Sequence, residues 1–122
     1  MTGYYFSEKS LVIKDESTGE VIWQGMPFGC SVERIMTLPG QRGCIVLLNG
    51  YEFSQSEWRH LSNLIHYNAD GKIKWTAQLP ETIDSFVAFD WEENRLYANS
   101  WSCFRVHIDL ETGKILNRIF TK

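Results

Sequence analysis

The fold prediction rests on the sequence Leu11-Val-Ile-Lys-Asp-Glu-Ser-Thr-Gly-Glu-Val-Ile-Trp23. Two short runs rich in β-branched and aromatic residues flank a polar turn with Gly19, and glycine readily takes the positive φ that closes a tight hairpin loop. This pattern predicts a β-hairpin. The pattern returns at Leu64-Ile-His-Tyr-Asn-Ala-Asp-Gly-Lys-Ile-Lys-Trp75 and at Val106-His-Ile-Asp-Leu-Glu-Thr-Gly-Lys-Ile-Leu-Asn117. The chain is therefore built from repeats.

A second strand pair is expected between successive hairpins, joining residues 35–38 to 44–49 and residues 86–89 to 95–99. The glycines of the three turns are 52 and 42 residues apart, which is the spacing of a four-stranded blade. The sequence predicts an all-β, antiparallel fold with about ten strands and almost no helix. We expect a single β domain over residues 1–122, with repeat units of approximately 3–49, 50–99 and 100–122.

The similarity extends to the residues before each hairpin. Gly3-Tyr-Tyr-Phe-Ser7 is similar to Gly50-Tyr-Glu-Phe-Ser54, and Ser100-Trp-Ser-Cys-Phe104 holds the corresponding place in the third copy. These three segments are expected to occupy equivalent places in the fold.

The turn sequences resemble a known repeat. Asp15-x-x-Thr18-Gly19-Glu20-Val21-Ile22-Trp23 is similar to the tryptophan-docking motif of the quinoprotein (PQQ-like) repeat, a β-propeller blade sequence. Asp109-x-x-Thr112-Gly113-Lys114 matches it as well, with Asn117 in place of the tryptophan, while the turn before Trp75 is one residue shorter. The resemblance implies propeller-like blades in which Trp23 and Trp75 dock between blades. No cofactor-binding residue of the quinoproteins is recognisable.

The length of the chain departs from that family. Closed propellers have about four to eight blades, whereas 122 residues provide about two and a half. The blades can stack as a compact β-sandwich, form a ring with other copies, or leave edges covered by loops. We favour the sandwich, because 43% hydrophobic residues in alternating strands suffice for a core within one chain.

Composition limits the cellular setting. The formal net charge is −3, and no apolar run approaches the roughly 20 residues of a membrane span. No signal peptide is recognisable, and three cysteines cannot all pair with one another. These features predict a cytoplasmic protein that neither crosses nor binds a membrane.

The motifs of catalysis and cofactor binding are missing from the sequence. The cysteines lack the paired spacing of zinc ligands, and no glycine-rich phosphate loop occurs. The paired carboxylates all lie in expected turns, and the basic residues are scattered singly. We therefore expect no enzyme activity, no cofactor, no metal and no nucleic-acid partner.

About eight residues around 55–62 are added between strands of the second unit, and extra length on a repeat scaffold often lies on the functional face. Tryptophans outside the docking positions are candidates for interfaces. The sequence predicts a protein-binding surface on two patches. The predicted contact residues are Glu52, Glu57, Trp58, Arg59 and His60 of the first patch, Asp90, Trp91, Glu92 and Glu93 of the second, and in addition Trp101.

The most concrete form of this hypothesis is an immunity-type inhibitor that masks the active site of a basic, nuclease-like bacterial toxin, since opposite charge speeds encounter. One alternative is a small-molecule or enzymatic β domain, with a sugar stacked on Trp58 or Trp101. Another is a protomer of a larger propeller ring, so a homo-oligomer stays open.

Overall fold

The computed structural model describes residues 1–121 and confirms the all-β prediction. It has eleven strands, one more than the approximate number expected, and two short helical turns. The strands are β1 (Thr2–Ser7), β2 (Ser10–Asp15), β3 (Val21–Gly25), β4 (Val32–Thr37), β5 (Cys44–Leu48), β6 (Leu64–Tyr67), β7 (Ile73–Thr76), β8 (Phe86–Glu92), β9 (Arg95–Ser100), β10 (Phe104–Ile108) and β11 (Ile115–Phe120). The helical turns are η1 (Pro27–Gly29) and α1 (Gly50–Ser54). No helix in the described part of the chain is long and apolar enough to cross a membrane.

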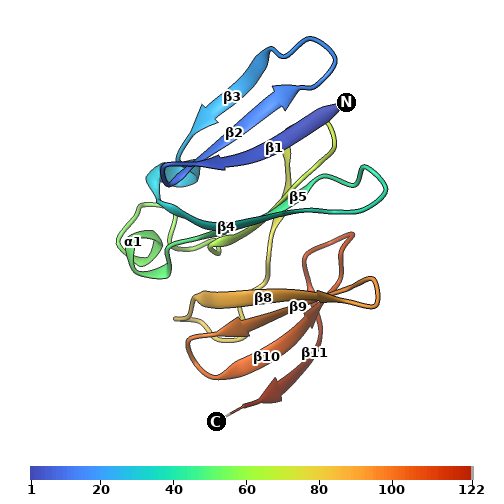
Figure 1. Ribbon diagram of the computed structural model, residues 1–122. Helices are drawn as coiled ribbons and strands as arrows, with labels where there is room; N and C mark the ends of the chain where they lie inside the picture. The colour runs from blue at the N-terminus through green and yellow to red at the C-terminus, as the bar shows by residue number, and fades with distance from the viewer. Residues whose placement is uncertain (122) are drawn as a thin grey trace.

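Consecutive strands form three antiparallel sheets (Figure 1). Their orders are β1-β2-β3, β4-β5-β6-β7 and β8-β9-β10-β11. The first sheet lacks a strand beside β1, in the place that β4 and β8 hold in the other sheets. The expected boundary between the first two repeat units, at 49/50, falls inside the second sheet, after β5. The unit 50–99 therefore combines the last two strands of the second sheet with the first two strands of the third.

The hairpins form where the repeat predicts them, as β2-β3, β6-β7 and β10-β11. Gly19, Gly71 and Gly113 have φ of +75°, +84° and +76°. The Gly113 amide donates to the Asp109 carbonyl at 2.7 Å, whereas the Gly71 amide donates to Asn68, one residue nearer, at 3.0 Å. The middle hairpin therefore has a tighter turn, as its shorter sequence requires.

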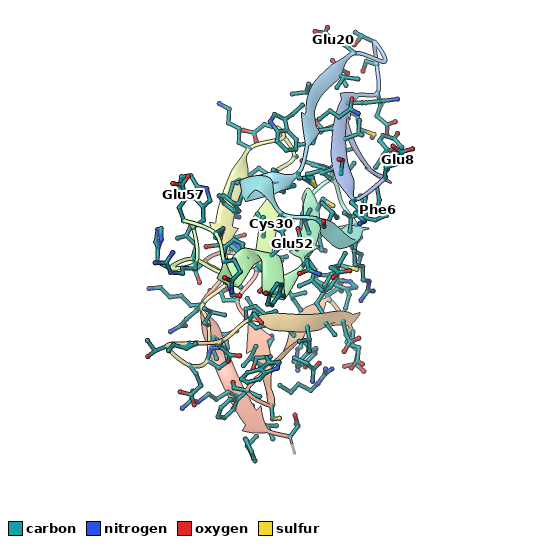
Figure 2. All side chains as sticks on the ribbon, turned by 90° about the vertical axis from the view of Figure 1, so that its left-hand side faces the viewer. Phe6, Glu8, Glu20, Cys30, Glu52 and Glu57 are labelled. Carbon is teal, nitrogen blue, oxygen red and sulfur yellow. The ribbon has the colours of Figure 1, made fainter. Side chains whose placement is uncertain are left out.

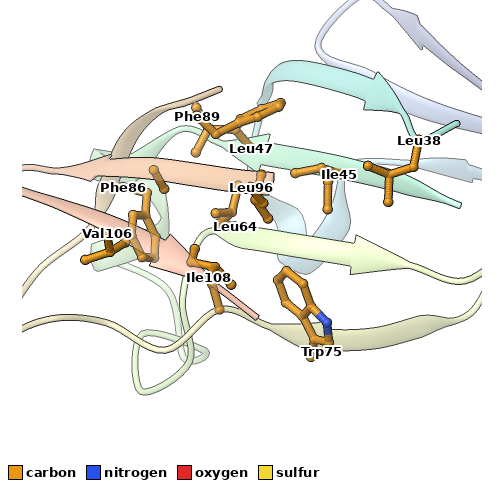
Figure 3. Close-up of a cluster of buried hydrophobic side chains, with 12 residues drawn as sticks. Leu38, Ile45, Leu47, Leu64, Trp75, Phe86, Phe89, Leu96, Val106 and Ile108 are labelled. Carbon is orange, nitrogen blue, oxygen red and sulfur yellow. The ribbon is translucent and has the colours of Figure 1, made fainter. Parts of the chain in front are cut away.

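The sheets pack face to face over two apolar clusters, as expected for a core within one chain. One cluster joins the first and second sheets and includes Tyr4, Leu11, Ile13, Val46, Ile65 and Tyr67. The other joins the second and third sheets and includes Ile45, Leu47, Leu64, Phe86, Phe89 and Val106 (Figure 3). The two central strands of the middle sheet, β5 and β6, thus bury side chains on both faces, and every residue of these two strands is buried.

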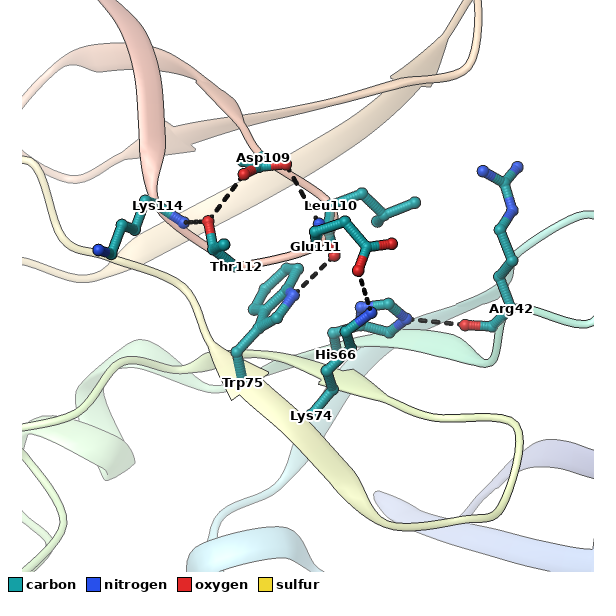
Figure 4. A network of polar contacts seen from close by, with 9 residues as sticks. All are labelled: Arg42, His66, Lys74, Trp75, Asp109, Leu110, Glu111, Thr112 and Lys114. Carbon is teal, nitrogen blue, oxygen red and sulfur yellow. Dashed lines mark hydrogen bonds and ion pairs between the residues drawn. The ribbon is translucent and has the colours of Figure 1, made fainter.

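The expected docking of Trp75 is confirmed. Its side chain is 8% exposed and its Nε1 donates to the Leu110 carbonyl of the third sheet at 2.8 Å (Figure 4). The indole also covers Gly113, where an added Cβ would lie 2.6 Å from the ring. This contact joins the second sheet to the turn of the third.

The corresponding expectation for Trp23 is wrong. Trp23 pairs with Ile13 as Trp75 pairs with His66, so the two tryptophans hold equivalent places. Yet Trp23 is 40% exposed, and its ring lies against Gly25 rather than Gly71. Ile13 and Ile22 are the side chains nearest Gly71. The shorter turn of the middle hairpin changes the surface on which this indole would have docked.

The similar segments 3–7 and 50–54 have different structures, which corrects the expectation of equivalent places. Residues 3–7 lie in β1 and pair with β2, while residues 50–54 form α1. Asn49 favours the helix at residues 50–54, because its side chain accepts a hydrogen bond from the Glu52 amide at 2.9 Å and caps the helix. Similar residues therefore adopt different structures here because the residue that precedes them differs.

Candidate functional site

A groove of about 440 Å³ opens between the second and third sheets. Its walls are mostly apolar, and two aromatic side chains on them are strongly exposed, Tyr51 at 77% and Trp101 at 73%. Val87 on β8 is a third exposed apolar side chain. The remaining lining residues are Glu33, Arg34, Leu47, Leu48, Gly50, Ser85, Phe86 and Ala88.

The two aromatic residues line the same groove because they occupy equivalent loops of neighbouring sheets. Tyr51 follows β5 and Trp101 follows β9, and both strands are second in their sheets. In Figure 1, α1 and the first residues of β8 lie on the same side of the molecule. The repeat thus brings together side chains that are 50 residues apart in the sequence.

A framework of hydrogen bonds holds the loops of this groove. The Trp101 amide donates to the Ser85 carbonyl at 2.8 Å, and Asp84 accepts from the Ser102 amide at 3.0 Å. Asn63, which is fully buried, donates to the carbonyls of Leu48 and Phe86 and accepts from the Phe86 amide, each at 2.8 Å. Hydrogen bonds therefore hold the backbone of the loops that carry the exposed rings.

The charged side chains at the groove have partners within the chain. Glu33 accepts from Asn49 Nδ2 at 2.7 Å. The Arg34 guanidinium lies 4.2 Å from the centre of the Phe89 ring and donates to the Phe89 carbonyl. One negative and one positive group thus flank the aromatic walls.

The predicted patch near the insertion is partly structural. Glu52 accepts from the Ser31 amide at 2.9 Å and from its hydroxyl at 3.0 Å, and these bonds lower the pKa of Glu52. Trp58 packs on Phe28, with ring centres 5.5 Å apart. Figure 2 shows Glu52 and Glu57 on the side of the molecule that carries α1.

Two further predicted residues complete this patch. Arg59 donates to the Ser56 carbonyl at 3.1 Å, and the His60 ring lies 6.4 Å from that of Trp58. Both also line a smaller groove of about 320 Å³ that shares Gly50 and Ser85 with the Tyr51–Trp101 groove. The insertion therefore borders the smaller groove.

The second predicted patch lies elsewhere. Asp90 and Glu92 project from one face of β8, while Trp91 packs on the opposite face against the core. Arg105 lies 2.8 Å from Asp90 and 3.9 Å from Glu92, so it offsets their charge. The β8-β9 turn with Glu93 is at the far end of β8 from the groove (Figure 1), about 16 Å beyond Ala88, the last residue of β8 that lines it, at 3.3 Å per residue. The structure does not bring the two predicted patches together.

The outer face of the third sheet is polar at places where the second sheet is apolar. Asn99 pairs with Arg105 in the register that pairs Leu47 with Leu64, and Asn117 holds the place of Trp75. Polar outer faces are typical of terminal repeats in stacked architectures. Another sheet packed on this face would have to satisfy these polar groups.

The buried titratable groups are held in their neutral forms. Burial raises the pKa of Cys44 to about 12 and that of Tyr4 to about 12, and it lowers the pKa of His66. A thiol with a raised pKa is a poor nucleophile at neutral pH. Among residues 1–121, no three His, Cys, Asp or Glu side chains are grouped closely enough to hold a metal ion.

Sequence reasoning identified Trp101 but missed Tyr51, Val87 and the 89%-exposed Ile83 beside the smaller groove. The signal for Tyr51 was present, because Gly50-Tyr51 and Ser100-Trp101 are aligned in the repeat. The same repeat also aligns Tyr51 with Tyr4 of β1, which is buried. That alignment suggested a buried side chain, so the exposure of Tyr51 was not predicted.

Three stacked antiparallel sheets with an aromatic groove between two of them define a partial propeller-like protein. The fold is similar to the computationally designed Ika8 protein (TM-score 0.60, 11% identity) and to BamB from Moraxella catarrhalis, a β-propeller protein (TM-score 0.57, 9% identity). Each comparison covers 98% of this chain, which spans 36% and 35% of the length of those two proteins. The likeness shows the fold alone, and the assignment to the PQQ-like repeat stays a prediction.

The chain belongs to the family described as "Domain of unknown function (DUF7957)", which matches residues 1–120. No curated protein sequence matches it.

Proposed function

We propose that this chain is a non-catalytic protein-binding module whose contact surface is the groove between Tyr51 and Trp101. The observation that carries the proposal is the exposure of these two aromatic side chains, 77% and 73%, on loops that line the same groove. Tyr and Trp are enriched among the residues that dominate binding energy. Each can bury about 150–250 Å² of surface.

The backbone around the groove supports a preformed site. Asn63 and Asp84 fix the loops by hydrogen bonds, so little backbone ordering remains for the moment of binding. Ordering of loops and side chains is a major cost of association. A partner with an apolar protrusion gains the most from such a surface.

The partner that we favour is a basic protein. The chain carries a formal net charge of −3, and Glu57 lies in the insertion, which borders the smaller groove beside the Tyr51–Trp101 groove. Complementary charge raises association rates and suppresses wrong partners. In its most specific form, the proposal is an immunity-type inhibitor that masks the active site of a nuclease-like toxin.

Co-purification from the native host tests this function. The tagged chain is compared with a Tyr51→Ala/Trp101→Ala variant and with a control, Ile119→Ala, which removes an exposed apolar side chain from β11. A stoichiometric basic protein should be retained by the wild type and the control, be lost from the double variant, and be released by salt. Inhibition of that protein's nuclease activity then tests the immunity role.

Two results would count against the proposal. A partner retained equally by all three proteins would place the contact surface outside the groove. A wild-type chain that retains no protein at physiological salt would contradict a stable protein partner and would favour a small ligand in the groove.

A further inference from the structure

The first sheet ends at β1 with an edge that no strand within residues 1–121 covers. The Glu16 amide donates to the Met1 carbonyl, and the backbone bonds of an antiparallel pair alternate, so every second residue of β1 directs its amide and carbonyl away from β2. These outward-facing residues are Thr2, Tyr4 and Phe6. The edge therefore offers a regular row of donors and acceptors to an added strand.

The Phe6 side chain shows what the missing strand leaves uncovered. In the register of the strand pairs, Phe6 holds the place in the first sheet that Leu47 holds in the second. Leu47 is 4% exposed and has Arg34 of β4 beside it, whereas Phe6 is 48% exposed and lies at the margin of the molecule (Figure 2). The open edge thus carries an apolar ring that has no cover.

β1 differs from the other edge strands of the described chain. β3, β4, β7, β8 and β11 each pair with their neighbour through a register shift, and such irregularities turn an edge away from further pairing. β1 pairs with β2 without a shift, and its sequence Thr2-Gly-Tyr-Tyr-Phe-Ser7 has no charged residue and no proline. It therefore lacks the features that commonly prevent strand addition.

A groove of about 490 Å³ lies beside the first half of this strand. Residues 1–5 form one wall, and residues of the β4-β5 turn, among them Thr37 and Leu38, form much of the other. Phe6 does not line the groove, so the exposed ring and the groove lie at opposite ends of β1.

We propose that the open edge of β1 (Thr2, Tyr4 and Phe6) pairs with the same edge of a second copy of this chain, which gives a symmetric dimer. When two antiparallel β1 strands pair with Tyr4 opposite Tyr4, Thr2 of each copy lies opposite Phe6 of the other. The outward-facing amides and carbonyls then match, with about six hydrogen bonds between the copies.

This register also matches the ring to the groove. Phe6 points to the same face of the sheet as Tyr4, which packs toward the second sheet, and residues opposite one another on paired strands share a face. Phe6 of each copy therefore lies beside Thr2 of the other, where the groove begins. A twofold interface requires such a self-complementary surface.

The second copy is the occupant that the chain itself specifies. One β1 strand supplies both the ring and the groove that receives it, whereas a segment of another protein would have to bring a ring of its own. The dimer goes beyond the proposed function and is independent of it, because the groove beside β1 shares no lining residue with the Tyr51–Trp101 groove.

Analytical ultracentrifugation of the full chain tests the dimer. Over protein concentrations from about 1 µM to about 1 mM, the mean mass should rise from 14.2 kDa toward twice that value. We expect a dissociation constant of about 10–100 µM, since a single strand pair forms a small interface.

A matched pair of variants locates the interface. Phe6→Lys and Phe120→Lys each replace an exposed phenylalanine of an edge strand, 48% and 59% exposed, and they change the net charge equally. Phe6→Lys should weaken the dimer at least about tenfold, because it removes the ring that enters the groove. Phe120→Lys should leave the dissociation constant within about twofold of the wild type.

Amide hydrogen exchange followed by ¹H–¹⁵N NMR tests the register. The amides of Thr2, Tyr4 and Phe6 should exchange more slowly as the protein concentration rises, because they gain acceptors only in the dimer. The amides of Gly3 and Tyr5 face β2 in the monomer and should change far less.

Three outcomes would overturn the proposal. These are a mass that stays at 14.2 kDa up to about 1 mM, equal weakening by the two lysine variants, or unchanged exchange at Thr2, Tyr4 and Phe6 in a chain that dimerises. A monomeric chain whose β1 amides are protected only by a protein retained in the co-purification would show that another protein, and not a second copy, supplies the strand.

Discussion

Replacing Gly113 by alanine should destabilise the fold by about 2–5 kcal/mol. An added Cβ at Gly113 would lie 2.6–2.8 Å from three atoms of the Trp75 ring, so the indole would have to leave its place. Overpacking of this kind costs about 1–3 kcal/mol. The backbone φ of +76° adds about 1–2 kcal/mol for any residue with a Cβ.

Gly19→Ala provides the control for that change. Gly19 ends a turn of the same length with φ of +75°, but nothing lies within 4 Å of its added Cβ. This variant should lose only the backbone contribution of about 1–2 kcal/mol. The entropy change of the unfolded chain is common to both variants and cancels in their difference.

Urea unfolding followed by tryptophan fluorescence measures both variants. Gly113→Ala should be less stable than Gly19→Ala by about 1–3 kcal/mol, with a red-shifted native emission, because Trp75 would become exposed. Equal losses in the two variants would refute the idea that the tryptophan contact joins the sheets.

Three further predictions concern buried polar groups. Asn63→Ala should lower the unfolding free energy by about 3 kcal/mol in urea titrations, since it leaves groups of β5 and β8 without partners; an unchanged midpoint would contradict this role. His66 has a lowered pKa from burial, so folding favours its neutral form and stability should fall as pH drops below 6.5, less steeply in His66→Phe; parallel pH profiles would argue against it. Ellman's reagent at pH 8 should modify one thiol per native chain, at exposed Cys103, and three after unfolding; rapid reaction of three native thiols would show that the buried cysteines are accessible.

The hairpins were predictable because their signals are local. Alternating apolar residues and a glycine at the turn fix a hairpin within about a dozen residues, and the repetition of the pattern supports each copy. Docking of Trp75 followed from the same motif. The position of Trp23 did not, because it depends on the turn of another hairpin, whose missing residue lies about 50 positions away.

The candidate site was less predictable than the fold. Trp101 has no packing role in the repeat and was identified on that ground, but the helix that exposes Tyr51 depends on the Asn49 cap. Glu52 illustrates the opposite error. Its carboxylate was predicted to face a partner, yet it binds Ser31, which is 21 residues away in sequence and adjacent in space.

The arrangement of each sheet from consecutive strands has a consequence for folding and mechanics. Each described strand pairs with strands that are next to it in the sequence. Contacts of low sequence separation favour rapid folding. Within residues 1–121, the segments 26–31 and 77–85 link one sheet covalently to the next. Under a pulling force applied at residues 1 and 121, we expect the sheets to separate as discrete steps, each hairpin unzipping strand by strand.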